Sequence, residues 1–238
     1  MTATINDIRS FWDDRARQFG SKARATLNES PLRRLEIRTM IGQIAACRPR
    51  RVLDVGCGNG FSTKQFAARF PEIEFFGVDY SEEMIRHAGD DGPDNCRFMV
   101  ADVLKPQTLP KGTFDLIITQ RCLQNIPDYS LQKQAIENLR KLLSSPGKLL
   151  LMECSKNGVR QLNKVRLALG RETIGNIQPW HNRFFLDGRM VRRYGAKIIH
   201  FSSTYMFLVK VVHPRLAKIA LVLPPVGRFG YDKLYVID

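Results

Sequence analysis

Hydrophobic runs of strand length alternate with amphipathic stretches through the middle of this 238-residue chain. The runs are Val52–Val55, Phe75–Val78, Phe98–Val100, Phe114–Thr119 and Lys148–Glu153. The stretches between them carry apolar positions at helical spacing and are Ser62–Phe70, Ser81–His87 and Ser130–Leu143. Regular alternation of strands and helices predicts a parallel sheet with helices on both faces. We therefore expect an α/β fold with a doubly wound, mostly parallel sheet of about seven strands.

Two further helices are predicted before this alternating part. Apolar side chains recur at helical spacing over Ile5–Phe19, which predicts an amphipathic helix. Ser30 and Pro31 have the pattern of an N-cap followed by a proline at the first helical position, so a second helix is expected over Leu32–Cys47.

The alternation stops after Cys154. The segments that follow are predicted as a helix over Val159–Leu169 ended by Gly170, a loop over Arg171–Arg183, a short helix over Phe185–Tyr194, a β-rich stretch over Ala196–Val212 and a strand over Lys233–Ile237. We expect the last two to pair as a hairpin-like edge of the sheet. Without an internal repeat or a linker, a single domain is expected over 1–238, divided into 1–48, a core over 49–154 and a basic region over 155–238.

Positive charge is concentrated late in the chain. Residues 1–139 carry 19 Lys and Arg against 18 Asp and Glu, a net charge of +1, whereas residues 140–238 carry 18 against 5, a net charge of +13. This asymmetry favours an anionic partner for the later part, such as an acidic or phosphorylated small molecule, a glycan, nucleic acid or an acidic protein surface. A basic surface that serves only solubility is the alternative.

Five scattered cysteines include no C-x-x-C pair, which argues against a disulfide framework and against a zinc site, so no metal is predicted. No stretch approaches the roughly 20 apolar residues of a transmembrane segment. The first residues, Met1–Asp7, lack the pattern of a secretory signal. We therefore expect a cytoplasmic protein.

Three alternating glycines occupy the passage from the first strand of the core to the following helix, in Asp54-Val-Gly-Cys-Gly-Asn-Gly60. Glycine allows the sharp turn and lets a ligand approach without meeting a Cβ, while the helix N-terminus offers unpaired N–H groups. A dinucleotide fingerprint would need Gly or Ala where Phe61 stands, and a Walker loop would need a G-K-[ST] sequence. The loop alone predicts a nucleotide-type ligand.

Carboxylates at the next strand ends extend this site. Asp79 ends the second strand of the core, 19 residues after Gly60, and Asp102 ends the third. Such carboxylates can accept ribose hydroxyls and an adenine amino group. The fourth strand, which begins at Phe114-Asp115, opens onto Gln120, Arg121 and Asn125. Because ligands of open α/β sheets bind outside the carboxyl ends of strands, we expect these residues to line one crevice.

This order of motifs resembles the class I S-adenosylmethionine-dependent methyltransferases, over about Arg51–Cys154. The resemblance implies a Rossmann-like fold, S-adenosyl-L-methionine as cosubstrate and an N-terminal helical lid. It implies that the cosubstrate is bound by the glycine loop, by the acid at the end of the second strand, and by residues that lie beside its adenine and its sulfonium. The residues at those positions are Asp54, Gly56, Cys57, Gly58, Asp79, Tyr80, Met84, Asp102, Val103 and Gln120.

Acceptor chemistry is predicted for the strand ends and the basic region. No histidine follows the fourth strand, so Arg121 and Asn125 are expected to orient the acceptor as hydrogen-bond donors. The resemblance implies that Trp12 or Phe19, in the helical lid, shields the methyl group from water; a helix that only stabilises the sheet is the alternative. The sequence also resembles a bacterial small-molecule and glycan subgroup through further motifs. Their residues are Glu153, Asn163, Arg166, Trp180, His181 and Asn182. His181 and Glu153 are the candidate catalytic residues, and the others are candidate acceptor contacts.

Three functions remain open at this point. The leading hypothesis is methyl transfer to an oxygen or nitrogen of an anionic small molecule or glycan. The second is methylation of a lysine or terminal amine on an acidic protein surface. The third is a basic nucleic-acid-binding module that retains a cosubstrate pocket, because a basic channel needs no motif to bind nucleic acid.

Overall fold

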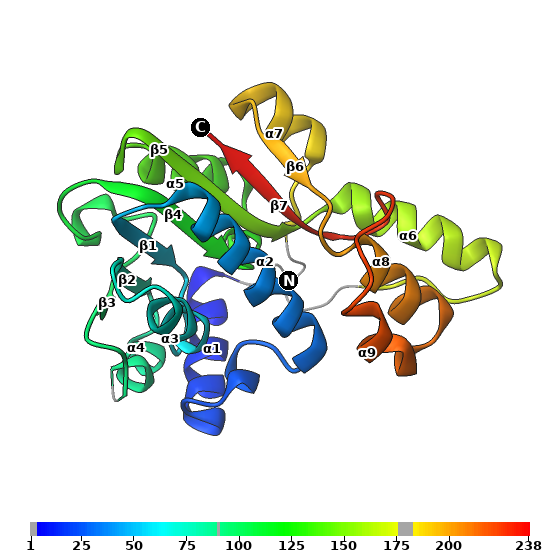
Figure 1. Cartoon of the computed structure of the whole chain (residues 1–238), viewed down its shortest axis with the longest axis horizontal. Coiled ribbons are helices and arrows are strands. Elements are labelled where there is room, and N and C mark those ends of the chain that lie inside the picture. Colours follow the sequence, from blue (N-terminus) through cyan, green and yellow to red (C-terminus); the bar gives the residue numbers. More distant parts are fainter. Residues whose placement is uncertain (1–3, 90, 176–182) are drawn as a thin grey trace.

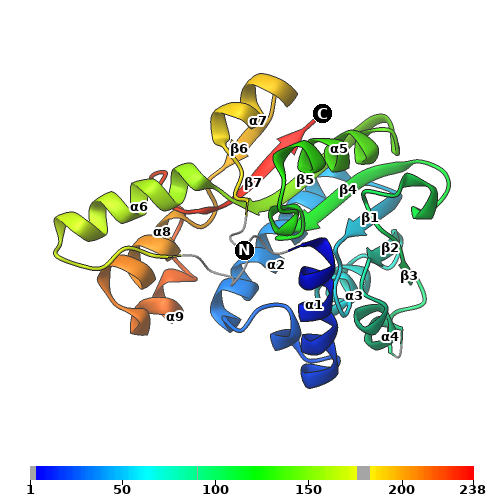
Figure 2. The same ribbon diagram turned by 180° about the vertical axis from the view of Figure 1, so that it is seen from behind.

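A seven-stranded sheet forms the centre of the molecule in the computed structural model, which describes residues 4–89, 91–175 and 183–238. The strand order is β3-β2-β1-β4-β5-β7-β6, and β7 runs antiparallel to both of its neighbours (Figures 1 and 2). The strands are β1 (Arg51–Val55), β2 (Glu74–Asp79), β3 (Cys96–Val100), β4 (Phe114–Gln120), β5 (Leu143–Cys154), β6 (Lys197–Ile199) and β7 (Asp232–Ile237). The predicted mostly parallel, Rossmann-like sheet is confirmed.

The described helices flank this sheet, because apolar side chains on both of its faces need cover. They are α1 (Ile5–Phe19), α2 (Ser30–Cys47), α3 (Phe61–Arg69), α4 (Glu82–Ala88), α5 (Tyr129–Arg140), α6 (Lys156–Ala168), α7 (Asp187–Tyr194), α8 (Ser203–Met206) and α9 (Ala217–Ala220). One face packs mainly against α2, α3 and α8, and the other against α5 and α7. Both faces of the sheet are therefore buried.

The predicted helix over Ile5–Phe19 is confirmed with these bounds. Thr4 caps it, since its side chain accepts a hydrogen bond from the N–H of Asp7 while the Asp7 carboxylate accepts one from the Thr4 N–H. The predicted cap of α2 is wrong: Ser30 is already helical, and Glu29 stands at the N-cap position without a side-chain cap bond. The Glu29 carboxylate is instead bound by Tyr205 and Lys210.

The β-rich stretch predicted over Ala196–Val212 is largely wrong. Only β6 is extended, and the chain then forms α8 and a π-helical segment, η4 (Phe207–Val212). Tyr205 and Val209, four residues apart, are both buried in the core beside α2. A short apolar run fits a buried helix as well as a buried strand, and tertiary packing decides between them. The predicted edge pairing is confirmed for β6 and β7.

Candidate functional site

A cavity of about 210 Å³ opens at the carboxyl ends of the parallel strands. Its walls come from the end of β1, the end of β2, the segments after β3 and β4, the end of β5 and the start of β7. Parallel strands bring their carboxyl ends to one edge of the sheet, where loops diverge and leave room for a ligand. Helix α1 covers one side, where Ile5, Ile8 and Trp12 line the cavity.

The loop after β1 forms the glycine-lined part of the wall. Gly56 and Gly58 have φ angles of 72° and 56°, which side chains rarely adopt. A Cβ on Gly56 would lie 2.3 Å from the Sγ of Cys122, and a Cβ on Gly58 would lie 2.6 Å from a methyl carbon of Thr26. Glycine is therefore required here by the backbone conformation and by the neighbouring side chains.

Asp79 lies at the end of β2 and lines the cavity. Its carboxylate accepts hydrogen bonds from the N–H of Gly58 at 2.9 Å and from the N–H of Ser81 at 3.0 Å. Burial raises the pKa of Asp79 to about 6, against the effect of those hydrogen bonds. The two bonds fix the carboxylate beside the glycine loop, where it can accept further bonds from a ligand diol.

Most of the predicted cosubstrate residues line the same cavity, and two do not. Those that line it are Gly56, Gly58, Asp79, Tyr80, Met84, Asp102, Val103 and Gln120. Asp54 lies behind the loop, where it is buried and accepts a hydrogen bond from the Thr63 hydroxyl at 2.6 Å. Cys57 is buried as well. These two side chains support the loop from behind.

Glu153 lies beneath the cavity floor and is fully buried. Its carboxylate accepts a hydrogen bond from the Thr119 hydroxyl at 2.7 Å and bonds from the N–H groups of Cys122, Leu123 and Gln124 at 3.0–3.1 Å. The side chain therefore joins β5 to the loop after β4. It does not line the cavity, although the strand end that carries it does reach the predicted edge.

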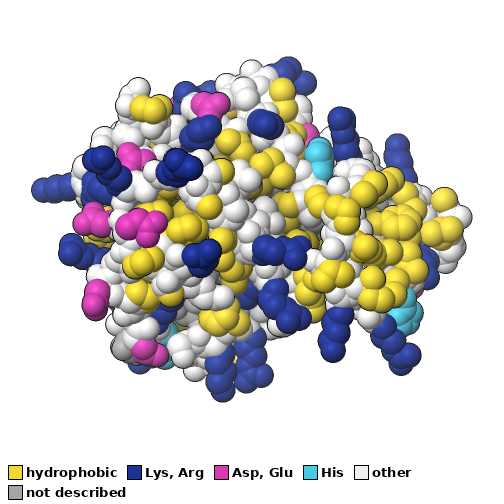
Figure 3. Space-filling view, viewed as in Figure 1, with side chains coloured by type: hydrophobic (Ala, Val, Ile, Leu, Met, Phe, Trp, Pro, Cys, Tyr) yellow, Lys and Arg dark blue, Asp and Glu magenta, His cyan; other side chains and the backbone are white. Residues whose placement is uncertain are grey.

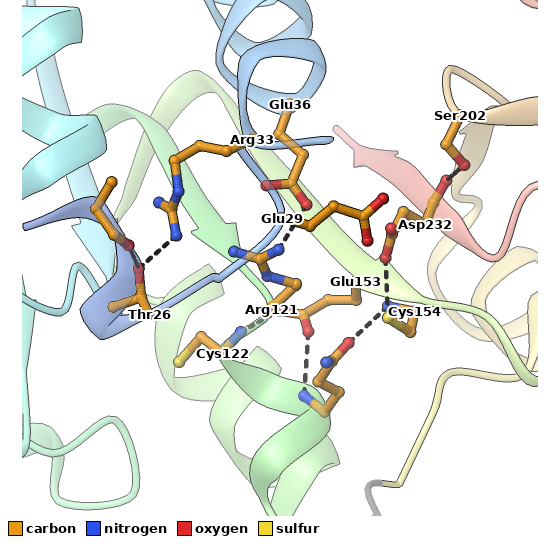
Figure 4. A network of polar contacts seen from close by, with 12 residues as sticks. Thr26, Glu29, Arg33, Glu36, Arg121, Cys122, Glu153, Cys154, Ser202 and Asp232 are labelled. Carbon is orange, nitrogen blue, oxygen red and sulfur yellow. Dashed lines mark hydrogen bonds and ion pairs between the residues drawn. The ribbon is translucent and has the colours of Figure 1, made fainter. Parts of the chain in front are cut away.

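Charged side chains gather at the other end of the cavity (Figure 4). Arg121 has a φ of 53°, which is unusual for a residue other than glycine, and its Nη1 lies 2.9 Å from Oε1 of the buried Glu36. Arg33 donates a hydrogen bond to the Thr26 hydroxyl at 2.6 Å. Burial raises the pKa of Glu36 to about 7, and Arg121 acts against this rise. The charge of Arg121 is thus balanced by Glu36 at this end of the cavity.

Asp232 belongs to this cluster because β7 is antiparallel. Its position opposite Cys154 places the start of β7 at the edge where β5 ends, and Asp232 lines the cavity. Its Oδ1 lies 2.9 Å from the Cys154 Sγ, which donates to it. Its Oδ2, although buried, has no hydrogen-bond partner among the described residues, and the same holds for Nε2 of Gln120. Burial raises the pKa of Asp232.

Only some of the predicted acceptor residues line the cavity. Trp12, Arg121 and Asn125 line the cavity. Asn163 and Arg166 lie on α6 and bind the backbone of the following loop at Ile174 and Glu172. The remaining three, Trp180, His181 and Asn182, lie outside the described residues.

Sequence reasoning missed several residues that line the cavity. The polar ones are Thr26, Glu29, Gln124, Tyr231 and Asp232. Only Asp232 could have been found from the sequence, through the predicted terminal strand. An antiparallel strand at this place brings its first residue to the edge of the sheet where the parallel strands end. No group of His, Cys, Asp and Glu suited to a metal ion occurs within residues 4–89, 91–175 and 183–238.

The model of the methyltransferase domain family matches residues 49–182, which is more than half of the chain. The chain belongs to this family. It is a class I methyltransferase domain, with S-adenosylmethionine as the methyl donor, as the motif order at the cavity predicts. The match includes the glycine loop and the acids at the ends of β2 and β3.

Curated relatives resemble part of this methyltransferase. Trans-aconitate 2-methyltransferase of Deinococcus radiodurans is 34% identical over 123 residues, which are 51% of this chain and 44% of that protein. The enzyme of the same name from Escherichia fergusonii is 39% identical over 96 residues, which are 40% of this chain and 36% of that protein. The chain thus matches less than half of the length of these relatives.

Solved structures of low sequence identity share the fold. Magnesium protoporphyrin IX methyltransferase of Synechocystis, solved with bound SAH, is 17% identical, has a TM-score of 0.60 and covers 98% of both chains. The plantazolicin methyltransferase BpumL is 14% identical, has a TM-score of 0.58 and also covers 98% of both chains. At these identities, the likeness establishes the fold alone.

Proposed function

We propose that this chain transfers the methyl group of S-adenosylmethionine to an oxygen or nitrogen of a small molecule bound in the cavity. The proposal rests on Asp232 Oδ2 and Gln120 Nε2, two buried atoms that belong to residues lining the cavity and have no partner in the described part of the chain. A buried polar atom left unpaired costs about 1–3 kcal/mol. An acceptor with a hydroxyl or amino group would satisfy both atoms, since one can accept a hydrogen bond and the other can donate one.

The donor would lie along the glycine loop. Gly56 and Gly58 would contact it, and Asp79 would accept its ribose hydroxyls, with Asp102 beside the adenine. Gln120, at the end of β4, would stand near the reacting centre. This placement is supported by the shared lining of the cavity and by the fixed Asp79 carboxylate.

Methyl transfer needs alignment, and a base only if the acceptor atom carries a proton that must leave. S-adenosylmethionine supplies an electrophilic methyl group, whose bond to sulfur breaks, with the electron pair kept by sulfur, as the bond to the acceptor forms. The proton of the acceptor would go to Asp232 Oδ2. Because burial raises the pKa of Asp232, its ionised form is a stronger base than an exposed aspartate.

The lining favours a neutral or cationic acceptor. Arg121 is the only Lys or Arg among the described residues that line the cavity, and it is already paired with Glu36. The carboxylates of Glu29 and Asp232 lie at the same end; Glu29 is paired with Lys210, whereas Asp232 has no ion pair among the described residues. Of residues 140–238, as far as they are described, no Lys or Arg lines the cavity. The excess charge of the basic region therefore supports no anionic acceptor inside the cavity.

Relatives named for trans-aconitate, for magnesium protoporphyrin IX and for plantazolicin support a small-molecule acceptor. A lysine or terminal amine of a protein is the second candidate, because the carboxylate of Asp232, whose Oδ2 has no partner among the described residues, would attract an ammonium group.

The test is incubation with methyl-labelled S-adenosylmethionine and a fractionated lysate. We expect label in the small-molecule fraction, and far less of it with an Asp79→Ala variant when S-adenosylmethionine is not saturating. Label in protein would favour the second candidate, and label in nucleic acid would contradict the proposal. Failure to bind S-adenosylmethionine in calorimetry would reject methyl transfer altogether.

A further inference from the structure

Large apolar side chains are exposed on the helical arm, which we define as residues 156–169 and 203–229. In Figure 3, hydrophobic side chains gather over α8 and α9, on the side of the molecule away from β3. The exposed fractions are 78% for Val222, 69% for Val226 and 54% for Ile219, and 60% for Leu167 at the end of α6. The exposed apolar residues of the arm are Leu167, Leu169, Val212, Ile219, Val222, Leu223, Val226 and Phe229, here called the apolar patch. Single exposed apolar residues are common, but a contiguous group marks an interaction surface.

The loop after α9 is held in this exposed position by its own contacts. Thr204 Oγ1 donates a hydrogen bond to the Pro224 carbonyl at 2.6 Å and accepts one from the Val226 N–H at 2.7 Å. The ring of Phe229 packs against that of Phe207, with centroids 5.8 Å apart. These contacts fix both ends of the loop on the arm while Val222 and Val226 project outward. The exposure is therefore a built feature of the fold.

Positive charge predominates around this patch. Residues 203–229 of the arm contain four Lys and Arg and no Asp or Glu, and one of the four, Lys210, is paired with Glu29. Arg215, Lys218 and Arg228 are exposed on the arm itself, and Arg171 joins it through a hydrogen bond to the Val212 carbonyl. Figure 3 shows Lys and Arg side chains projecting around the hydrophobic area. The surface thus combines an apolar centre with a cationic rim.

We propose that the helical arm binds the surface of an anionic phospholipid bilayer, with the apolar patch inserted at the level of the headgroups. Apolar side chains beside Lys and Arg bind such interfaces through burial and through attraction to anionic lipids. A second copy of the chain would bring two uniformly cationic arms together, which like-charge repulsion opposes. None of the described helices is long and apolar enough to cross a bilayer, so the contact is with the surface.

This binding is independent of the proposed function, since no Lys or Arg of the arm lines the cavity in the described structure. Membrane binding would explain the excess positive charge of the basic region, which the lining of the cavity does not explain. The membrane proposal can therefore succeed or fail whatever the methyl acceptor is.

The test is co-sedimentation of the full chain with two kinds of vesicle, phosphatidylcholine alone and phosphatidylcholine with phosphatidylserine. We expect binding to the second kind that weakens as salt is added, because salt screens the attraction. An R215Q/K218Q double variant should lose about tenfold or more in partition, since each basic residue near an anionic surface contributes several-fold. A V222S/V226S double variant should lose about tenfold through the lost burial.

Matched controls separate the patch from general effects. Lys111→Gln removes an exposed charge in the turn before β4, outside the arm. Met99→Ser removes an exposed apolar side chain on β3, at the edge of the sheet opposite β6. Both variants should bind vesicles like the unchanged protein. Calorimetry with S-adenosylmethionine checks that every variant remains folded. Absence of vesicle binding by the unchanged protein, or equal binding by patch and control variants, would overturn the proposal. So would a dimer in light scattering that V222S/V226S dissociates, because the patch would then join two copies of the chain.

Discussion

The two walls of the cavity are built from different kinds of sequence. The wall that we assign to the donor, here called the donor wall, uses the ends of neighbouring parallel strands, in chain order from Gly56 through Asp79 to Asp102. The wall that we propose for the acceptor, here called the acceptor wall, joins the segment before α2, the loop after β4 and the start of β7, through Glu29, Arg121 and Asp232. The first follows from a repeated strand–helix pattern, whereas the second depends on how distant segments pack. A short pattern can therefore reveal the donor while the acceptor stays hidden.

A change on the acceptor wall should affect methyl transfer and leave the donor site intact. We expect Asp232→Asn to lower the transfer rate about thousandfold, because an amide cannot take the acceptor's proton, while the affinity for S-adenosylmethionine stays the same. Labelled transfer and calorimetry measure the two quantities. Asp238→Asn, just beyond the other end of β7, is the matched control and should behave as the unchanged protein. An undiminished rate for Asp232→Asn would remove the assigned base.

A change on the donor wall should have the opposite signature. Asp79→Ala removes the carboxylate that would bind the ribose and leaves the N–H groups of Gly58 and Ser81 unpaired. We expect the affinity for S-adenosylmethionine to fall about a hundredfold, since hydrogen bonds to a charged group contribute about 1.5–3 kcal/mol each. Asp115→Ala serves as control: this carboxylate binds Arg50, Arg51 and Ser144 at the other end of β4. Asp115→Ala should lower the free energy of unfolding without changing the affinity for S-adenosylmethionine. A loss of that affinity in Asp115→Ala would mean that the effect of Asp79→Ala is not specific to the cavity.

Beneath the donor wall, Asp54 should make stability depend on pH. Burial raises its pKa from 3.8 to about 7 in the folded chain. The folded state therefore holds the proton more tightly, so this stabilisation is complete below about pH 4 and is lost as the pH rises through about 7. Asp54→Asn should remove a pH-dependent part on the order of 4 kcal/mol from the free energy of unfolding. Denaturant unfolding between these pH values measures it, and identical slopes for both proteins would refute the assignment.

The smallest expected effect lies in the helical arm, away from both walls. Thr204→Val removes the two hydrogen bonds that hold the loop after α9. We expect a loss of about 1 kcal/mol in the free energy of unfolding, faster hydrogen exchange at the Val226 amide, and an unchanged donor affinity. Thr39→Val, whose hydroxyl binds only the Leu35 carbonyl within α2, should cost less. Unaltered exchange at Val226 would show that other contacts order the loop.

The sequence predicted most of the core because strand ends repeat a local rule. Apolar runs ended by Asp79 and by Asp102 were placed correctly, since parallel strands all bring their carboxyl ends to the same edge. The segment over Ala196–Val212 failed because its β-branched and aromatic residues suit a buried helix equally well, and only contacts with α2 decide. The local sequence pattern therefore predicted the strands of the sheet better than it predicted the helices of the arm.

The orientation of side chains at the site was harder to predict. Glu153 reaches the expected edge, yet the loop after β4 folds over it and takes up its carboxylate with three backbone N–H groups. Asp232 was missed because β7 is antiparallel to β5. Its first residue therefore lies at the cavity, where the parallel strands place their last residues. Both depend on tertiary contacts that no short pattern encodes.

The reversed direction of β7 also bears on how the molecule folds. The donor wall needs contacts between β1, β2 and β3, which follow one another along the chain. The acceptor wall has to join Glu29 to Asp232, and closing so long a loop carries a larger entropy cost and slows pairing. We expect refolding to restore the donor wall in an early kinetic phase. The acceptor wall should form in a later phase, when β7 inserts between β5 and β6.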